Sequence, residues 1–223
     1  MKENENSQYE ILKFKLIVVG DQNTGKSSIL NRFANNNFDD NYQATIGLDF
    51  ANKNVTIHDQ EIRLILYDTA GQEKFRSLIP MYIREAQVIL LIYDISNRKS
   101  FENIPNWFSE VLNVKNDEAV FALIGNKMDL SDNREVTYEE GKKLANEKNM
   151  FFEEMSAKTG KNIMEFFNNT IFEAIYKKFQ KKFDDNKNID NIDYNTPSTE
   201  SNIIRFNISG KNESKIQKKI KCC

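Results

Sequence analysis

The chain has 223 residues and a formal net charge of −2, with 39% hydrophobic and 29% charged residues. This length fits one folded domain plus a tail, and the near-neutral charge gives no reason to expect general nucleic-acid binding. The two cysteines, Cys222 and Cys223, are adjacent at the end of the sequence, which excludes a disulfide framework. The only histidine, His58, excludes a histidine-rich zinc site and argues against a Ser-His-Asp mechanism.

The sequence carries no targeting or membrane-spanning pattern. Residues 1–10 are polar and mixed in charge, unlike a signal peptide. The longest central apolar run, residues 88–93, is far shorter than the roughly 20 residues that a membrane span needs. We therefore expect the chain to be made and kept in the cytosol.

Short apolar runs alternate with helical patterns in the body of the chain. Strands are predicted at 14–19, 88–93, 120–124 and 151–155, a hairpin at 55–57 and 62–67, and helices at 27–35, 100–112 and 138–149. The clearest helix runs from Ile163 to Phe179, and Asn162 with Glu165 resembles its capping box. This alternation predicts an α/β fold, with a mostly parallel sheet covered on both faces and one antiparallel edge.

The apolar periodicity stops near Asp184. Residues 184–200 carry five acids and one lysine, and residues 211–223 carry five lysines and one glutamate. Such composition predicts a flexible tail. The expected organisation is an N-terminal extension over 1–12, a folded domain over 13–183 and a tail over 184–223.

A phosphate-binding motif directly follows the first predicted strand. Residues 20–27 fit the pattern G-x-x-x-x-G-K-[ST] and open a predicted helix, as this motif requires. Gly20 and Gly25 allow backbone angles that aim N–H groups inward and form an anion cradle with the helix N-terminus. Lys26 can place its charge on the β- and γ-phosphates, and the Ser27 hydroxyl can ligate magnesium. The alternative is a glycine turn with a chance lysine.

A second motif indicates which nucleotide base the site would bind. Asn126-Lys127-Met128-Asp129 comes just after the predicted strand at 120–124, at the carboxyl edge of the sheet where ligands bind. The Asp129 carboxylate can accept two hydrogen bonds from the N1–H and 2-amino groups of guanine, which adenine does not offer. Ser156-Ala157-Lys158, just past the strand at 151–155, is placed to close over the base.

A third motif, Asp68-Thr69-Ala70-Gly71-Gln72-Glu73, ends the strand at 62–67. Asp68 can hold magnesium through a water molecule. Gly71 can offer its N–H to a γ-phosphate because it has no side chain, and Gln72 can orient an attacking water. The alternative interpretation is a charged turn after a strand.

In this order, the three motifs resemble the Ras superfamily of small GTPases over residues 13–182. Four features are similar to the Rab family, namely Gly20-Asp21, residues 42–50, residues 67–75 and Cys222-Cys223. Residues 75–84 most resemble the Golgi-associated branch of Rab proteins.

The resemblance implies a P-loop NTPase fold: a three-layer sandwich with a mostly parallel six-stranded sheet, five helices and one antiparallel edge strand. It also implies two switch segments, residues 36–49 and 71–84, which the γ-phosphate orders and its loss relaxes. The Thr45 hydroxyl would meet Mg²⁺ and its N–H the γ-phosphate, while Phe38 would pack beside the guanine.

The resemblance extends to the individual site residues and to the partners. Expected catalytic residues are Gln72, Lys26 and Thr45, and expected Mg²⁺ ligands are Ser27, Thr45 and, through water, Asp68. GTP or GDP is expected to bind Asn23, Thr24, Gly25, Lys26, Ser27, Ser28, Phe38, Thr45, Gly71, Asn126, Lys127, Asp129, Ser156, Ala157 and Lys158. The implied protein partners are effectors, an exchange factor, an activating protein, a prenylation escort and a GDP-dissociation inhibitor.

Two positions depart from the family pattern. Tyr67 stands where Rab proteins usually have tryptophan, in an exposed aromatic triad with Phe50 and Tyr82, so we expect partner choice to differ. Gln22 stands where Ras has glycine, and its side chain would crowd the γ-phosphate region. Slow intrinsic hydrolysis is therefore expected.

The terminal Cys222-Cys223 resembles the Rab signal for double geranylgeranylation. Two lipid chains anchor a protein stably, whereas one holds it only marginally. The tail lysines would add about 1 kcal/mol each at an anionic leaflet. The alternatives are two ordinary exposed thiols and lysines that are merely solvated.

These features predict a GTP-hydrolysing switch on the cytoplasmic face of an internal membrane, which cycles through the cytosol and regulates vesicle traffic at or near the Golgi. One alternative is a nucleotide-locked, membrane-bound scaffold with negligible hydrolysis, against which Gln72 and Thr45 argue. Another is a soluble P-loop ATPase or nucleoside kinase, against which Asp129 and the terminal cysteines argue.

Overall fold

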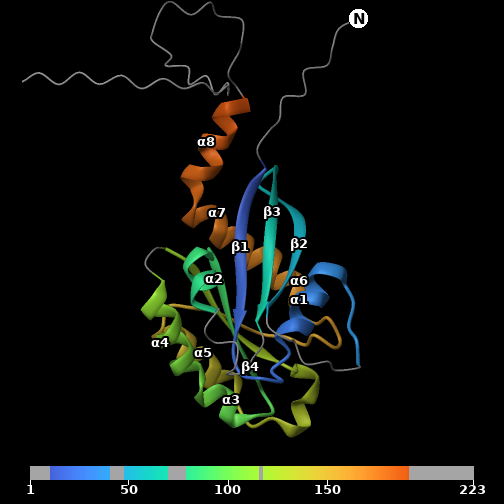
Figure 1. Ribbon diagram of the computed structural model, residues 1–223. Coiled ribbons are helices and arrows are strands. Elements are labelled where there is room, and N and C mark those ends of the chain that lie inside the picture. The colour runs from blue at the N-terminus through green and yellow to red at the C-terminus, as the bar shows by residue number, and fades with distance from the viewer. Residues whose placement is uncertain (1–10, 41–47, 70–78, 116–117, 191–223) are drawn as a thin grey trace, which may run out of the picture. The chain divides into compact units, whose positions relative to one another are not determined.

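Six strands of the described residues form one sheet in the order β2-β3-β1-β4-β5-β6 (Figure 1). The computed structural model describes residues 11–40, 48–69, 79–115 and 118–190. The β2–β3 pair is antiparallel and the other pairs are parallel. The predicted α/β fold is therefore confirmed. The strands are β1 Leu12–Val19, β2 Leu48–Ile57, β3 Gln60–Thr69, β4 Val88–Asp94, β5 Val120–Asn126 and β6 Phe151–Glu154.

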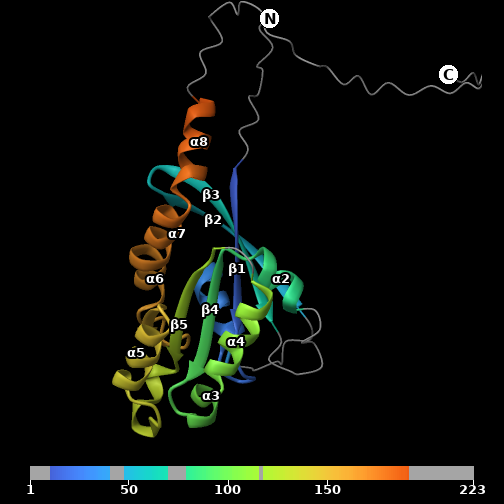
Figure 2. The same cartoon turned by 90° about the vertical axis from the view of Figure 1, so that its left-hand side faces the viewer.

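Helices cover both faces of this sheet. One buried cluster packs α1 and α6 to α8 against the sheet, and a second packs α2 to α5 against the opposite face. Figure 2 shows α6, α7 and α8 in one column beside the sheet. The helices are α1 Lys26–Asn35, α2 Ile79–Glu85, α3 Arg98–Glu102, α4 Ile104–Val114, α5 Tyr138–Glu147, α6 Ile163–Phe166, α7 Phe172–Lys178 and α8 Gln180–Asp190, with a 3-10 helix η2 at Met128–Asn133 and a π-helical turn η3 at Phe167–Ile171. None of the helices in the described part of the chain has the length and apolar character to cross a membrane.

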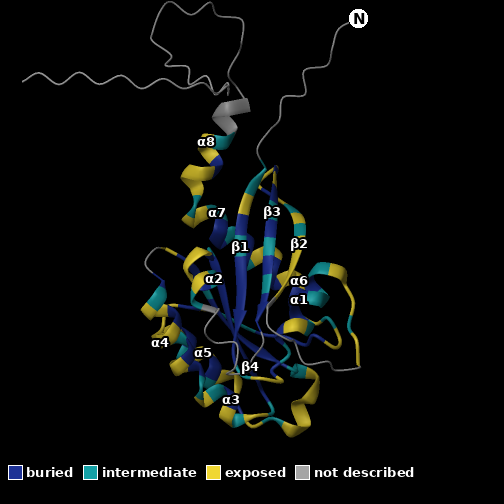
Figure 3. Cartoon of the chain, in the orientation of Figure 1, coloured by how far each residue is buried: buried dark blue, intermediate teal, exposed yellow. Residues whose placement is uncertain are grey.

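The central strands are apolar on both sides because both faces are covered. In β1, Leu16 and Val18 belong to one buried cluster, whereas Ile17 and Val19 belong to the other. Every residue of β4 is buried, as the dark central strands of Figure 3 illustrate. Parallel strands of this kind appear in a sequence as continuous apolar runs, so their positions could be predicted.

The predicted hairpin is confirmed, with strands longer than the apolar pattern indicated. His58 and Asp59 connect β2 to β3 and both have positive φ, 46° and 64°. Two left-handed residues in a row give the turn a twist that matches paired strands. The His58 ring stacks on Tyr176 at 3.8 Å between centroids, and its Nε2 lies 2.8 Å from Glu173 Oε1. The hairpin tip is therefore held against α7.

The predicted capping box at Asn162 is wrong. Asn162 has a left-handed backbone (φ 64°) and makes no side-chain capping bond. A capping residue needs an extended backbone and an oxygen that accepts from the first helical turn. The Asn162 amide instead donates to the Glu154 carbonyl at 2.8 Å, which links the helix start to β6. A capping box does occur at the start of α5, between Thr137 and Glu140.

Two other helices differ from the sequence prediction. The single helix predicted at 100–112 divides into α3 and α4 at Asn103, because Pro105 lies in the first turn of α4 and cannot continue a preceding helix. The C-terminal helix continues as α8 to Asp190, past the predicted start of the tail, because Phe183 is buried and stacks on Phe14 at 5.6 Å. The rest of that tail lies outside the described residues.

Candidate functional site

The loop at 20–27 connects β1 to α1 at the carboxyl edge of the sheet. Gly20 has φ 143° and Gly25 has φ 87°, both in the region that favours glycine. A Cβ on Gly20 would lie 2.2 Å from the Ile92 carbonyl oxygen, and one on Gly25 would lie 2.2 Å from Asn126 Nδ2. Only glycine fits at both positions, so the loop can pass close to β4 and β5.

Lys26, the cation of this loop, is 5% exposed. Its Nζ donates to the Asp21 carbonyl at 2.7 Å, and burial lowers the pKa of Lys26 to about 8. Asp68 and Asp21 act in the opposite direction because their negative charges favour the ammonium form. An anion that enters the loop would likewise favour the charged form, so the site is suited to phosphate.

The Asn126 side chain joins two loops. Asn126 ends β5 and is 1% exposed. Its Nδ2 donates to the Thr24 carbonyl at 2.8 Å, and its Oδ1 accepts from the Ala157 N–H at 3.2 Å. A single buried amide therefore fixes the 20–27 loop relative to the loop at 156–158.

The two residues that flank Met128 have different surroundings. Lys127 has a left-handed backbone (φ 66°), and its Nζ pairs with Asp94 Oδ2 at 2.6 Å. Asp129 is exposed, and its Oδ1 accepts from the buried Ser156 hydroxyl at 2.5 Å. This bond orients the Asp129 carboxylate at the protein surface, where it can accept from the donors of a planar ring.

Arg32 holds the 156–158 loop to α1, a contact that sequence reasoning missed. Its guanidinium donates to the carbonyls of Ala157 at 2.9 Å and Lys158 at 2.7 Å, and also to Asn36 at 3.0 Å. The helix that follows the phosphate motif is thus bonded to the 156–158 loop. A contact across 125 residues leaves no local pattern that could have revealed it.

A half-buried ion pair, also missed from the sequence, links the segment after Asp129 to the end of β6. Arg134 follows η2 and binds Glu154 through two hydrogen bonds, at 2.6 and 2.7 Å. The Glu154 side chain is 3% exposed, and this bonding raises the pKa of Arg134 above its ordinary value. Glu154 lies two residues before Ser156, so the pair fixes the segment after Asp129 to the segment before the 156–158 loop.

The remaining predicted site residues fall into two groups. Ser27 is exposed at the start of α1, Asp68 is 9% exposed at the end of β3, and Phe38 packs half-buried against the core. Asn23 and Lys158 are exposed in their loops, and Ser28 is half-buried in the first turn of α1. Thr45, Gly71 and Gln72, like the terminal cysteines, lie outside the described residues.

Comparison with protein families gives a match that covers this whole arrangement. Residues 15–177 match the model of the Ras family. The match spans more than half of the chain, and it runs from within β1 to within α7.

The Arg134–Glu154 pair gives a stability prediction. Glu154→Gln removes the buried negative charge that the half-buried Arg134 guanidinium binds, so we expect the free energy of unfolding to fall by about 1.5 kcal/mol. Glu85→Gln breaks the exposed pair with Lys15 and should cause little change. Urea titrations of both variants at one fixed GDP concentration would test this. Equal shifts of the two midpoints would contradict it.

Proposed function

Since the chain belongs to the Ras family and is a GTP-binding switch, we propose that it hydrolyses GTP and regulates vesicle-mediated transport as a Rab-type protein. The observation that carries the proposal is the buried Asn126 side chain, which bonds both the Thr24 carbonyl and the Ala157 N–H. Because one amide fixes both loops, the site is suited to hold the phosphates and the base of one nucleotide together.

The phosphates would bind the 20–27 loop. Backbone N–H groups at the start of a helix favour anions, and the positive φ of Gly25 turns the loop around them. Lys26 adds the positive charge on the β- and γ-phosphates. The residues proposed for this role are Asn23, Thr24, Gly25, Lys26, Ser27 and Ser28.

The guanine would bind between the segment at 126–129 and the loop at 156–158. The Asp129 carboxylate, oriented by Ser156, would accept from N1–H and the 2-amino group. Phe38 would pack beside the ring. The other residues proposed to surround the base are Asn126, Lys127, Ala157 and Lys158.

The donor set at the phosphate end fits a hard divalent cation, which prefers oxygen ligands. Ser27 is an exposed residue where α1 begins, and the Asp68 charge acts on the neighbouring Lys26. We propose that Ser27, Thr45 and, through water, Asp68 hold Mg²⁺. When bound, Mg²⁺ neutralises charge on the β- and γ-phosphates.

Hydrolysis would proceed by in-line attack of water on the γ-phosphorus. The bond from this phosphorus to the oxygen that bridges the β- and γ-phosphates breaks, that oxygen stays on GDP, and the water oxygen stays on the released phosphate. Gln72 orients the water, the N–H groups of Thr45 and Gly71 hold the γ-phosphate, and Lys26 stabilises charge on its oxygens. Gln22 would crowd this region, so we expect a slow intrinsic rate that an activating protein raises.

Partner proteins would recognise the switch segments and the aromatic side chains beside them. Phe50 is 66% exposed and pairs with Tyr67 across β2 and β3, and the Tyr67 and Tyr82 rings lie 5.0 Å apart. These three side chains offer an apolar surface next to residues that the γ-phosphate would order. We propose this surface for effectors, the exchange factor, the activating protein and the GDP-dissociation inhibitor.

The proposed location is the cytoplasmic face of the Golgi or a nearby membrane, with cycling through the cytosol. Its support is the resemblance of residues 75–84 to Golgi-associated Rab proteins and of Cys222-Cys223 to a double prenylation signal. The tail lysines would add a weaker, salt-sensitive attraction.

Base choice gives the first functional test. Asp129→Asn should lower the affinity for GTP by at least about a hundredfold and favour xanthosine triphosphate, whose 2-oxo group needs a donor. Titration of fluorescent nucleotides would measure both affinities. Asp132→Asn, an exposed acid on the same 3-10 helix, is the matched control. If Asp129→Asn binds GTP as tightly as the parent, the assignment of Asp129 is wrong.

Hydrolysis gives the second test. Gln72→Leu should slow the intrinsic single-turnover rate by at least about tenfold while nucleotide binding stays nearly intact, because the lost group acts in the transition state. An unchanged rate would remove Gln72 from the mechanism. A parent protein that does not hydrolyse GTP even with added cell extract would instead support the nucleotide-locked scaffold.

Membrane attachment gives the third test, with a fluorescent tag at the N-terminus. Replacement of both Cys222 and Cys223 by serine should move the protein from Golgi membranes to the cytosol, with normal GDP binding. Cys222→Ser alone should leave partial, mistargeted attachment, since one chain binds only marginally. A double variant that still pellets with membranes in high salt would contradict the lipid-anchor proposal.

A further inference from the structure

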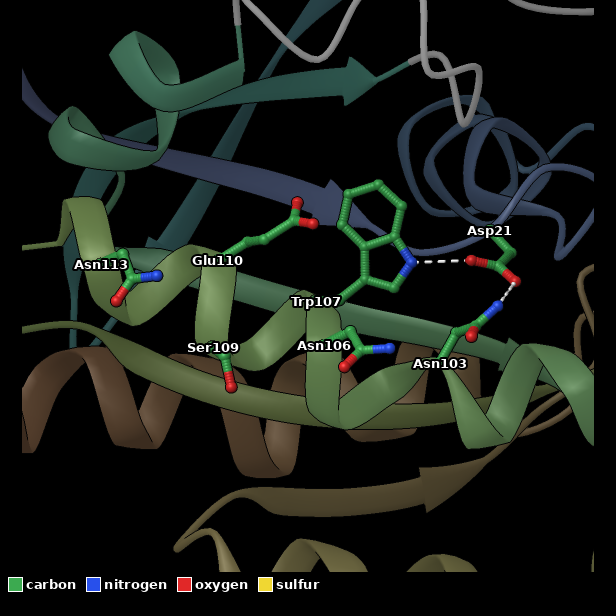
Figure 4. A pocket seen from close by; sticks show the side chains of 7 residues that line it. All are labelled: Asp21, Asn103, Asn106, Trp107, Ser109, Glu110 and Asn113. Atoms are coloured by element: carbon green, nitrogen blue, oxygen red, sulfur yellow. Dashed lines mark hydrogen bonds between the residues drawn. The ribbon is translucent and has the colours of Figure 1, made fainter.

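Asp21 is an acid inside a loop suited to bind anions. It is the second residue of the 20–27 loop, and a carboxylate aimed at the bound phosphates would repel them. The side chain instead turns toward α4, as Figure 4 shows, where Asp21 Oδ2 accepts from Asn103 Nδ2 at 2.6 Å and Oδ1 accepts from Trp107 Nε1 at 2.8 Å. Both carboxylate oxygens are thus held by donors.

The backbone of the same residue holds the phosphate-binding groups. The Asp21 carbonyl accepts from Lys26 Nζ at 2.7 Å and from the Thr24 hydroxyl at 2.9 Å. The Asp21 carbonyl therefore orients the buried Lys26 ammonium. The Asp21 side chain is in turn bonded to Asn103 and Trp107. Trp107 is itself 4% exposed, so this partner of Asp21 is held within the core.

We propose that Asp21 is a positioning residue for phosphate binding, which acts through Lys26 by fixing the 20–27 loop to Asn103, the residue that precedes α4, and to Trp107 on α4. This inference rests on the nucleotide binding proposed above. Charge-assisted bonds to a carboxylate are short and strong, so they hold the loop better than a neutral residue would. The residue thereby contributes to binding without a contact to the nucleotide.

A phosphate-specific readout separates this role from a general effect on folding. GDP and GMP share guanine and ribose, but GMP lacks the β-phosphate that Lys26 binds. Asp21→Ala should therefore lower the affinity for GDP by about tenfold and the affinity for GMP by less than about twofold. Asn106→Ala is the matched control, because Asn106 lines the same hollow one turn away and should change neither value.

A swap of the hydrogen-bonding groups tests the contact itself. Asn103→Asp places a second carboxylate against Asp21 and should weaken GDP binding at least as much as Asp21→Ala. Combining it with Asp21→Asn should restore GDP affinity to within about threefold of the parent. The amide introduced at position 21 then donates to the new carboxylate at 103, and its oxygen still accepts from Trp107.

Trp107 also provides a spectroscopic signal, since it is the only tryptophan in the chain. With GDP bound, Asp21→Ala should change the tryptophan emission, and Asn106→Ala should not. The inference is overturned if Asp21→Ala changes GDP and GMP affinities by the same factor, if it leaves GDP affinity unchanged, or if the double variant is no better than Asn103→Asp. A parent that does not bind GDP would overturn the proposed function instead.

Discussion

The site depends on one buried amide. Asn126 is bonded on one side to the Thr24 carbonyl and on the other to the Ala157 N–H, and it is almost fully enclosed. Its proximity also leaves no room for a Cβ on Gly25. Loss of this side chain would leave a donor and an acceptor unpaired in the interior, where each is costly. The geometry of the 20–27 loop and of the 156–158 loop thus follows from the same residue.

Other contacts that cross the fold support this arrangement. Arg32 bonds α1 to the 156–158 loop, Arg134 pairs with Glu154, and Asp21 bonds to α4. All of them involve segments at the carboxyl edge of a sheet whose central strands are buried on both faces. Because the strands are held by two apolar clusters, these polar contacts act from a rigid frame.

Much of the fold and the motif positions could be predicted, because strands buried on both faces leave apolar runs and the loops carry their chemistry in short patterns. The predicted cap at Asn162 failed because its amide bonds β6, a contact distant in sequence. The division at Asn103 depends on Pro105, whose position inside the predicted helix was a signal available in the sequence. Arg32 and Arg134 could not be found in this way, since the partners of a surface-type residue are set only by the folded chain.

The central claim is that these loops form one site for a guanine nucleotide, and nucleotide competition tests it most directly. The full chain would be loaded with fluorescent GDP and Mg²⁺, and then titrated with unlabelled GDP or ADP. We expect GDP to displace the probe near stoichiometric concentration and ADP to fail at about a thousandfold excess, because adenine lacks the donor pair for Asp129. Displacement by both nucleotides at similar concentrations would contradict the account.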